Sequence, residues 1–415
     1  MIKICKNKDD FPAFKCINLP LSKSISNRVM ILNFLTAQTT DLNNKSSADD
    51  TKLLQEKLFQ IKHNENNADF VEIDIDNAGT AMRFLTSVLA ISNGNYILKG
   101  NDRMHQRPIG ELVDALILLG ADITYVQEKG YPPLKIRGKN LINNEIEIRA
   151  DISSQFISSL LFIAGFLQNG LIIHLKGKIS SEPYIIMSLK LLERCGCDYL
   201  FENNCINVYH NKNPKLISSS ETDWSSAAFW YEMVSFSENL NVKLLNLRKD
   251  DTQGDMVIAD IFKSFGVNTL FENDGVLISK TGQIANEVEL DFCNYPDLAQ
   301  TVAVTASALS IKACLTGLES LKIKETDRLL ALFTELKKMN ADIEIKNNNS
   351  LIINPSKINI TETIHTYNDH RMIMSFAPLA ILHNKIMLDN TADVSKSYPD
   401  FWSDTIDMLT ITDEA

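Results

Sequence analysis

Apolar and polar positions repeat along the chain in a pattern of helix, turn and paired strands. Four amphipathic segments each close on a residue that tolerates the left-handed backbone, and these residues lie 76, 70 and 74 residues apart: Gly120, Gly196, Gly266 and Asn340. A strand, a turn and a second alternating strand follow each, with the second strands at 134–137, 206–209, 276–279 and 351–354. A period of about 70 residues exceeds the common solenoid periods. We therefore predict an α/β fold, in which copies of one α+β module pack into globular domains.

The chain is long enough for two domains. It has 415 residues, of which 45% are hydrophobic, so it can bury more core than one ordinary domain needs. Turn-forming or polar residues punctuate it near Leu19-Pro20 and near 218–221. We expect one domain from residues 1–19 and 222–415 and another from residues 20–221. The chain would then cross twice between them, leaving a cleft with polar loops on both sides.

Charge and composition exclude several classes of protein. A formal net charge of −11 argues against a nucleic-acid surface. Residues 1–15 lack the apolar core of a signal peptide, and the longest apolar stretch, 156–167, is too short and polar to span a bilayer. The seven cysteines form no C-x-x-C pair and no cluster with histidines at metal-ligand spacing. These features predict a cytoplasmic protein with reduced thiols and without a metal site, membrane partner or nucleic-acid partner.

Short polar clusters rich in cations recur along the chain. Residues 324–328 (KETDR) place two cations and two carboxylates in five positions. If a helix begins at Thr326, Arg328 lies over a first turn whose free N–H groups favour an anion. A surface helix with mixed charges is the simpler alternative. However, similar clusters lead into apolar runs at 22–28, 77–83, 103–108 and 368–371. Their recurrence predicts ligands with several negative groups.

Most of these positions also have a structural interpretation. Lys23 lies between two serines ahead of the apolar segment 29–35, which indicates a phosphate or carboxylate cradle or a plain helix cap. Gly79 lets backbone N–H groups approach an anion closely, but it is also compatible with ordinary capping. The serines in 153–155 and 180–184 either cap helices or bind hydroxyl groups of a ligand.

Two carboxylates are candidates for acid–base chemistry. Asp297 precedes the nearly uncharged segment 299–309, where it is either an N-cap or a general base. Glu325 lies between Lys324 and Arg328, which would keep it ionised unless a substrate intervenes.

Together, these clusters resemble the EPSP synthase (3-phosphoshikimate 1-carboxyvinyltransferase) family over nearly the whole chain and in the family's order. The resemblance is carried by SKSISNR at 22–28, NAGTAMR at 77–83, KETDR at 324–328, NDHR at 368–371 and KSYPDF at 396–401. It implies two domains, each built from three copies of a βαβαββ unit, and a monomer. It also implies transfer of the enolpyruvyl group of phosphoenolpyruvate to the 5-hydroxyl of 3-phosphoshikimate, with release of phosphate and without a metal or organic cofactor.

The resemblance also implies roles for individual residues. Asp297 would accept the proton of the attacking hydroxyl, Glu325 would protonate the methylene carbon, and Lys23 would contact both substrates. The other 3-phosphoshikimate ligands would be Ser24, Arg28, Ser153, Ser154, Gln155, Ser181, Tyr184, Ser320 and Lys324, besides Asp297. The phosphoenolpyruvate ligands would be Lys23, Gly79, Arg107, Gln155, Arg328, Arg371 and Lys396. The chain departs from the family pattern at Leu21, Phe84, Glu182 and Ser320.

Two alternatives remain open at this point. The UDP-N-acetylglucosamine enolpyruvyl transferases have a similar fold, but they usually carry a reactive cysteine before an Arg-Pro pair, and residues 100–108 contain none. A non-catalytic anion-binding scaffold would keep the cationic loops without the chemistry. The presence of both Asp297 and Glu325 argues against it.

Overall fold

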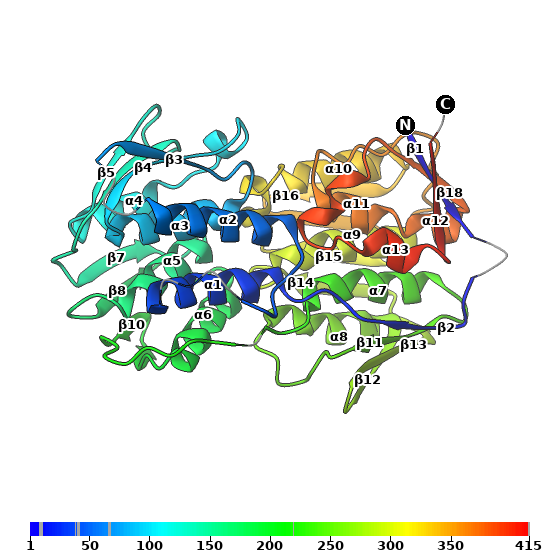
Figure 1. Ribbon diagram of the computed structural model, residues 1–415. Coiled ribbons are helices and arrows are strands. Elements are labelled where there is room, and N and C mark those ends of the chain that lie inside the picture. Colours follow the sequence, from blue (N-terminus) through cyan, green and yellow to red (C-terminus); the bar gives the residue numbers. More distant parts are fainter. Residues whose placement is uncertain (8–10, 38, 40–41, 65–67, 219, 414–415) are drawn as a thin grey trace. The chain divides into compact units, whose positions relative to one another are not determined.

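The computed structural model (Figure 1) describes residues 1–7, 11–37, 39, 42–64, 68–218 and 220–413. The chain forms two compact units. Unit 1 consists of Met1–Ser22, Ser47–Asp49 and Glu221–Ala415, and unit 2 of Lys23–Ser46 and Asp50–Ser220. None of the described helices has the length and apolar character that crossing a membrane requires.

Unit 2 contains two four-stranded sheets with one topology. The strand orders are β3-β4-β6-β5 and β7-β8-β10-β9. In each sheet the first two strands are parallel and the other neighbours antiparallel. A parallel pair needs a crossover, which α3 and α5 supply. The strands are β3 (Phe70–Asp74), β4 (Gly94–Lys99), β5 (Asp122–Tyr125), β6 (Leu134–Gly138), β7 (Glu145–Arg149), β8 (Leu171–Lys176), β9 (Tyr199–Glu202) and β10 (Cys205–Val208).

The helices of unit 2 pack on these sheets and on one another. Their contacts join α3 to α5, α5 to α6, and α1 to all three. Every residue of α3 from Ala81 to Ala90 is buried, as expected of a helix that is largely apolar on all sides. The helices are α1 (Lys23–Ala37), α2 (Asp49–His63), α3 (Gly79–Ile91), η1 (Met104–Gln106), α4 (Gly110–Leu118), α5 (Ser154–Ala164) and α6 (Glu182–Arg194).

Unit 1 repeats the same topology twice. The strand orders are β2-β11-β13-β12 and β14-β15-β17-β16, again with a parallel first pair. A third sheet has three strands in the order β18-β1-β19. The strands are β1 (Ile2–Lys6), β2 (Phe14–Ile17), β11 (Asn241–Leu245), β12 (Phe265–Glu272), β13 (Gly275–Ile284), β14 (Glu287–Asp291), β15 (Lys312–Thr316), β16 (Asp342–Lys346), β17 (Ser350–Asn354), β18 (Lys385–Leu388) and β19 (Leu409–Asp413).

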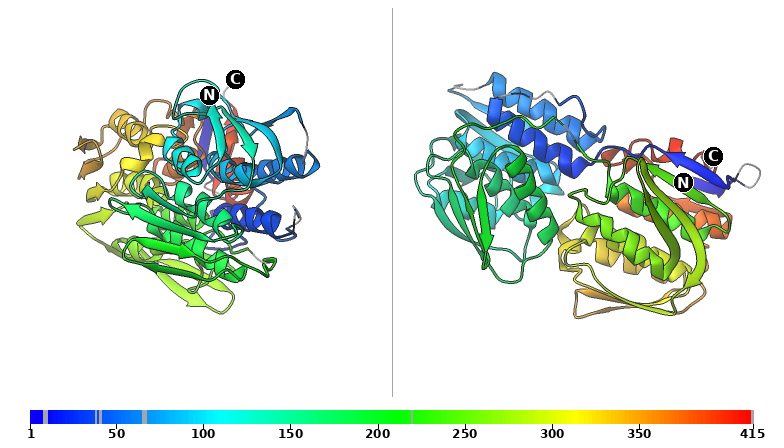
Figure 2. Two further views of the ribbon diagram at one scale, coloured as in Figure 1. Left: turned by 90° about the vertical axis from the view of Figure 1, so that its left-hand side faces the viewer. Right: turned by 90° about the horizontal axis from the view of Figure 1, so that it is seen from below.

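The helices of unit 1 pack against its sheets: α7 contacts β11, β12 and β13, and α9 contacts β15 and β17. The long strands of the first sheet lie beside these helices in the right view of Figure 2. Helix α7 is buried almost throughout and packs against α9, α11 and α12. The α-helices are α7 (Trp224–Phe236), α8 (Ile258–Ile261), α9 (Ala299–Ala308), α10 (Arg328–Lys338), α11 (His370–Phe376), α12 (Leu379–His383) and α13 (Phe401–Thr405). The 3-10 turns are η2 (Gly254–Val257), η3 (Phe262–Ser264), η4 (Pro296–Leu298), η5 (Glu319–Ile323) and η6 (Ala392–Lys396).

The predicted α/β fold with repeated modules is confirmed. Four sheets share one strand order, and the strands predicted at 134–137, 206–209, 276–279 and 351–354 correspond to β6, β10, β13 and β17. The four predicted cap residues all have positive φ, from 61° at Asn340 to 104° at Gly120. Two boundaries differ. Gly266 lies within β12 and does not close a helix, because the 3-10 turn η3 before it ends at Ser264. Helix α10 begins at Arg328 and not at Thr326, with Asp327 as its N-cap.

Candidate functional site

The candidate residues gather at the N-termini of the helices. Lys23, Gly79 and Ser154 begin α1, α3 and α5 of unit 2, while Arg328 begins α10 and His370 begins α11 of unit 1. The first N–H groups of a helix have no partner within it, and the helix dipole there favours negative charge. Each unit therefore contains several helix N-termini that favour the binding of an anion.

In unit 1, Arg328 is the centre of an arginine–carboxylate cluster, which we define as Asp297, Glu325, Arg328, Asp369 and Arg371. The Arg328 side chain is 1% exposed. Its Nε and Nη2 donate to the Asp369 oxygens at 2.7 and 3.2 Å, Nη1 donates to Asp297 Oδ1 at 3.0 Å, and Nη2 also donates to Glu325 Oε2 at 2.9 Å. Burial lowers the pKa of this guanidinium, but the three carboxylates outweigh burial and raise it overall.

Asp297 lies in η4 and contacts three cations. Arg371 donates through Nη1 to its backbone oxygen and through Nη2 to Oδ2, each at 3.1 Å. Lys324 Nζ lies 3.4 Å from Oδ1. Burial alone would raise the pKa of Asp297, but Arg371, Lys324 and Arg328 together hold it well below its usual range. The cap of α9 is Leu298, so Asp297 is not the N-cap of that helix.

Asp369 binds both arginines of the cluster and so fixes their relative positions. It is fully buried and is the N-cap of α11, where Oδ1 accepts the Arg371 N–H at 2.9 Å. The same carboxylate binds Arg328 through both oxygens. One side chain therefore sets the start of α11 and the orientation of the guanidinium that begins α10.

In unit 2, the Lys23 ammonium is paired with a carboxylate. Its Nζ lies 3.0 Å from Asp50 Oδ2, and both side chains are largely buried. Lys23 starts α1 and Asp50 belongs to the first turn of α2, so the ion pair ties two helix N-termini together.

The guanidinium of Arg28 is buried among neutral groups. It donates to Ser188 Oγ at 3.0 Å, to Ser158 Oγ at 3.5 Å and to the Ser24 carbonyl at 2.9 Å. The rings of Phe84 and Tyr184 lie 5.4 and 5.8 Å from it. Burial lowers the pKa of Arg28 to about 10. A buried cation in contact with hydroxyls and aromatic faces is well suited to bind an anion.

The start of α3 and the Arg107 side chain are in close contact. A Cβ atom placed on Gly79 would come within 2.5 Å of Arg107 Nη2, so a larger residue here would require the guanidinium to move. Arg83 holds the two segments together, because its guanidinium donates to the Gly79 carbonyl at 3.3 Å and to the Pro108 carbonyl at 3.0 Å.

The hydroxyl-bearing loops lie at the starts of α5 and α6, where their side chains are buried or half-buried. Ser153 is the N-cap of α5, since its Oγ accepts the Gln155 N–H at 3.3 Å. Gln155 Nε2 donates to Thr80 Oγ1 at 3.3 Å, which joins the start of α5 to that of α3. Ser181 is at the N-cap position of α6 with a left-handed backbone (φ 56°) and makes no side-chain cap bond.

The structure brings most of the predicted residues together within each unit. In unit 1, Asp297, Lys324, Glu325, Arg328 and Arg371 are in direct contact through ion pairs. Ser320 lies in η5, which packs against α10, and Lys396 ends η6, which packs against α11. In unit 2, the predicted residues are Lys23, Ser24, Arg28, Gly79, Arg107, Ser153, Ser154, Gln155, Ser181 and Tyr184.

Two carboxylates near the predicted residues do not stand out in the sequence, and a third stands in a motif without a predicted role of its own. Asp50 pairs with Lys23, which is 27 residues away, and Asp255 is buried near Asp297. Nothing in the local sequence marks either position. Asp369 stands in the 368–371 motif, and its position directly before a helix was a signal for a cap.

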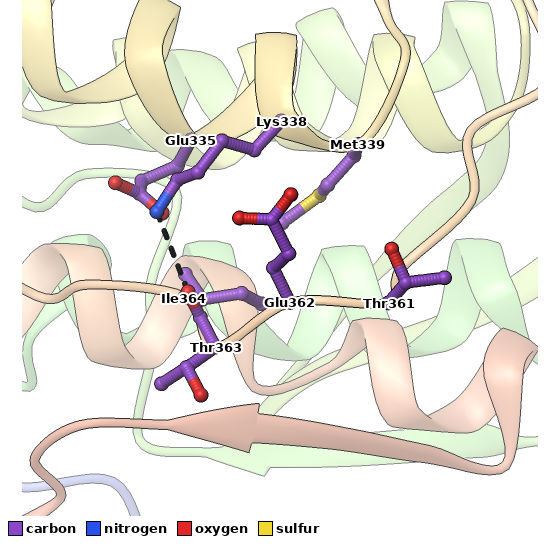
Figure 3. A pocket seen from close by; sticks show the side chains of 7 residues that line it. All are labelled: Glu335, Lys338, Met339, Thr361, Glu362, Thr363 and Ile364. Carbon is purple, nitrogen blue, oxygen red and sulfur yellow. Dashed lines mark hydrogen bonds and ion pairs between the residues drawn. The ribbon is translucent and has the colours of Figure 1, made fainter.

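Unit 1 also has a small pocket that includes none of the predicted residues (Figure 3). It is lined by Glu335, Lys338, Met339 and residues 361–364. Lys338 Nζ reaches the Thr363 carbonyl at 3.3 Å, and Glu335 accepts the Tyr367 hydroxyl at 2.7 Å. The polar groups at this pocket therefore bind to other groups of the protein. Among the residues that the structure describes, no group of three or more His, Cys, Asp or Glu side chains is arranged to hold a metal ion.

The fold and these clusters define a class: an α/β protein of repeated βαβαββ modules whose helix N-termini gather cations and carboxylates. The EPSP synthase (3-phosphoshikimate 1-carboxyvinyltransferase) family model matches residues 14–405. The chain is 42% identical to the 3-phosphoshikimate 1-carboxyvinyltransferase of Bacteroides fragilis strain YCH46, over 94% of this chain and 93% of that protein. The enzyme of the same name from Shewanella baltica strain OS155 is 36% identical, over 93% and 95%.

A solved structure agrees with this assignment at the level of the fold. The EPSP synthase from Acinetobacter baumannii superposes with a TM-score of 0.78, covering 100% of both chains at 20% sequence identity. The chain belongs to the EPSP synthase family.

The buried Arg328–Asp369 pair yields a prediction for stability. Asp369→Asn keeps the shape of the side chain but removes the charge that compensates a guanidinium with almost no access to water. We expect the free energy of unfolding to fall by about 3 kcal/mol, as is usual when one partner of a buried pair is lost. Urea unfolding followed by circular dichroism measures it. Asp122→Asn, which removes an exposed partner of Arg137, is the control and should leave the midpoint unchanged. Equal midpoints for Asp369→Asn and the native protein would contradict this role.

Proposed function

We propose that the protein transfers the enolpyruvyl group of phosphoenolpyruvate to the 5-hydroxyl of 3-phosphoshikimate, giving 5-enolpyruvylshikimate 3-phosphate and phosphate. Membership of the family supports the reaction, and the names of the Bacteroides and Shewanella relatives describe it. The arginine–carboxylate cluster is the observation that carries the proposal. It places two carboxylates, Asp297 and Glu325, in ion pairs with arginines. An anionic substrate could replace these carboxylates as the partner of the arginines.

The charges of the substrates fit the charges of the protein. The two substrates together carry two phosphates and two carboxylates, and each needs a cationic or hydrogen-bonding partner. In the proposal, Arg328, Arg371 and Lys396 of the domain formed by residues 1–19 and 222–415 bind phosphoenolpyruvate. The domain of residues 20–221 contributes Lys23, Gly79, Arg107 and Gln155 to the same ligand. The ligands of 3-phosphoshikimate are Lys23, Ser24, Arg28, Ser153, Ser154, Gln155, Ser181, Tyr184, Asp297, Ser320 and Lys324.

The reaction proceeds by addition and elimination. A proton adds to the methylene carbon of phosphoenolpyruvate, and the 5-hydroxyl oxygen attacks the cationic carbon that results. The hydroxyl loses its proton to Asp297, which gives a tetrahedral adduct. The methyl group then returns a proton as the carbon–oxygen bond to phosphate breaks. Glu325 and Lys23 serve the proton transfers at the methylene carbon, while the cations stabilise the leaving phosphate.

The ion pairs of the cluster suggest how Asp297 becomes a base. In the structure, Arg328 and Arg371 both donate to its carboxylate, which keeps its proton affinity low. An incoming phosphate or carboxylate competes for the same guanidiniums. As these cations turn to the substrate, Asp297 loses stabilising charge and its proton affinity rises. Binding of the anion thus prepares the residue that must accept a proton.

We extend the proposal to the setting of the enzyme. Both substrates are small, multiply charged metabolites, which do not cross a bilayer unaided. We therefore propose that the enzyme works in the cytoplasm. We also propose that it is a monomer and needs no metal or organic cofactor, as the resemblance to the family implies.

Measurement of phosphate release tests the function directly. We expect release when phosphoenolpyruvate is combined with 3-phosphoshikimate, and none when UDP-N-acetylglucosamine is the acceptor. Release only with the UDP sugar would favour the other enolpyruvyl transferases. No release with either acceptor, together with retained binding of 3-phosphoshikimate, would favour a non-catalytic scaffold.

Glu325→Gln separates proton transfer from anion binding. The amide keeps the size of the side chain and removes its acid–base function, so we expect kcat to fall by roughly 100-fold or more with little change in either KM. Steady-state kinetics measure both. Glu319→Gln, at an exposed position earlier in the same segment, is the matched control. A raised KM with normal kcat would show that Glu325 only supports binding.

Gly79→Ala tests the phosphoenolpyruvate site. The added methyl group displaces the Arg107 guanidinium, which lies within 2.5 Å of the new atom. We expect the KM for phosphoenolpyruvate to rise about tenfold, equivalent to about 1.4 kcal/mol, and the KM for 3-phosphoshikimate to change much less. Gly110→Ala serves as the control, because its nearest neighbour is 3.3 Å away. Unchanged kinetics would mean that Gly79 is only the first residue of a helix.

A further inference from the structure

A fully buried glutamate of α10 binds the segment that leads into α11. The Glu335 side chain is shielded from water and lies two turns after the start of α10. Its Oε1 accepts the Tyr367 hydroxyl at 2.7 Å, and its Oε2 accepts the His365 N–H at 3.0 Å. The Lys338 ammonium, one turn further along the same helix, pairs with Oε2 and donates to the Thr363 carbonyl at 3.3 Å (Figure 3). The carboxylate therefore has three donors, two of which belong to the segment before α11.

The segment that Glu335 binds contains a tight turn with unfavourable backbone geometry. Tyr367 and Asn368 both have a left-handed backbone, with φ of 56° and 53°. The Asp369 N–H donates to the Thr366 carbonyl at 3.0 Å and closes the turn across them. Asparagine tolerates this conformation, but tyrosine rarely adopts it. A turn of this kind persists because contacts from the surrounding structure hold it in place.

Two carboxylates from different elements supply these contacts. Asp389, which follows β18, accepts the Thr366 N–H at 2.9 Å and the Thr366 hydroxyl at 2.7 Å. Glu335 of α10 binds the next residue, Tyr367, which is 37% exposed and is anchored here by its hydroxyl group. The turn is therefore held both from the end of β18 and from the middle of α10.

The turn ends on the carboxylate that positions both arginines of the cluster. Asp369 is its last residue, and its side chain binds Arg328 through both oxygens and accepts the Arg371 N–H. Helix α10 thus binds this part of the chain at two places, through Arg328 at its start and through Glu335 two turns later. A shift of the turn would move Asp369, and with it the Arg328 guanidinium and the first turn of α11, which carries Arg371.

We propose that Glu335 is a positioning residue for the phosphoenolpyruvate site, which acts by holding the turn 366–369 and, through it, the guanidiniums of Arg328 and Arg371. The inference rests on the proposed function, because these two arginines are proposed ligands of phosphoenolpyruvate. Glu335 contacts no reacting atom in this proposal and acts only through the turn.

The first test is the steady-state kinetics of Glu335→Gln. The amide removes one acceptor oxygen and the negative charge that the three donors share. We expect the KM for phosphoenolpyruvate to rise about tenfold and the KM for 3-phosphoshikimate to stay within about twofold, because its proposed ligands Ser320 and Lys324 precede α10 and lie outside the turn. A lower unfolding midpoint with a native KM for phosphoenolpyruvate would show that Glu335 only stabilises the fold, and would overturn the proposal.

Glu232→Gln is a matched control, because it makes the same substitution at another fully buried glutamate of unit 1. Glu232 Oε1 accepts the Thr305 hydroxyl at 3.2 Å, and the two residues belong to α7 and α9, outside the turn. We expect both KM values of this variant to stay within about twofold of the native values. An equal rise in the KM for phosphoenolpyruvate would make the effect a general consequence of changing a buried carboxylate, and would contradict the role of Glu335.

Tyr367→Phe tests the same contact from its other partner and keeps the proposal testable if Glu335→Gln does not fold. The variant keeps the ring and removes the hydroxyl, so we expect the KM for phosphoenolpyruvate to rise about threefold. Both substitutions break one contact, so the double variant should show a rise of about tenfold and not the roughly 30-fold product of the two. An unchanged KM in Tyr367→Phe, or a double variant that shows the full product, would overturn the proposal.

The native protein separates this inference from the proposed function. Phosphate release by the native protein, together with an unaltered KM for phosphoenolpyruvate in the variants, would reject the role of Glu335 and leave the reaction standing. A native protein that releases no phosphate from the two substrates would reject the reaction itself.

Discussion

Charge compensation of one buried guanidinium organises the candidate site of unit 1. Arg328 is almost completely shielded from water and makes ion pairs with Asp297, Glu325 and Asp369. A buried charge is tolerated only when it is paired and hydrogen-bonded. The three carboxylates must therefore stay within reach of Arg328, which fixes the starts of α10 and α11 and the turn η4 relative to one another. The proposed acid and base are held in place by the same requirement.

The buried arginines of the two units are surrounded by different kinds of group. Arg328 is neutralised by carboxylates, whereas Arg28 of unit 2 is surrounded by serine hydroxyls, a carbonyl and two aromatic rings. In the proposed mechanism the first arrangement lets an anionic substrate exchange with Asp297 and so activate it. The second arrangement leaves the Arg28 guanidinium able to bind an anionic group whose bonds do not change in the reaction. Phe84, which departs from the family pattern, contributes one of the two rings at Arg28.

Much of the fold was accessible from the sequence because its signals are local. The cap residues and the alternating strands recur at a nearly constant spacing, so the repeated module could be identified before any contact was known. The same holds for Lys324, Glu325 and Arg328, which lie within one short motif, where Arg328 pairs with Glu325 and both cations pair with Asp297. Long-range pairings could not be predicted in this way. Asp50 reaches Lys23 only because two separate helices pack together, and it does not stand in a motif that indicates its partner.

A crystal structure with both 3-phosphoshikimate and phosphoenolpyruvate bound would test the central claim most directly. The account predicts that the guanidiniums of Arg328 and Arg371 contact oxygens of phosphoenolpyruvate together with Lys23 and Arg107. It also predicts that the Asp297 carboxylate lies within hydrogen-bond reach of the 5-hydroxyl. Substrates bound away from these four cations, with Arg328 and Arg371 still directed only at Asp297, would contradict it.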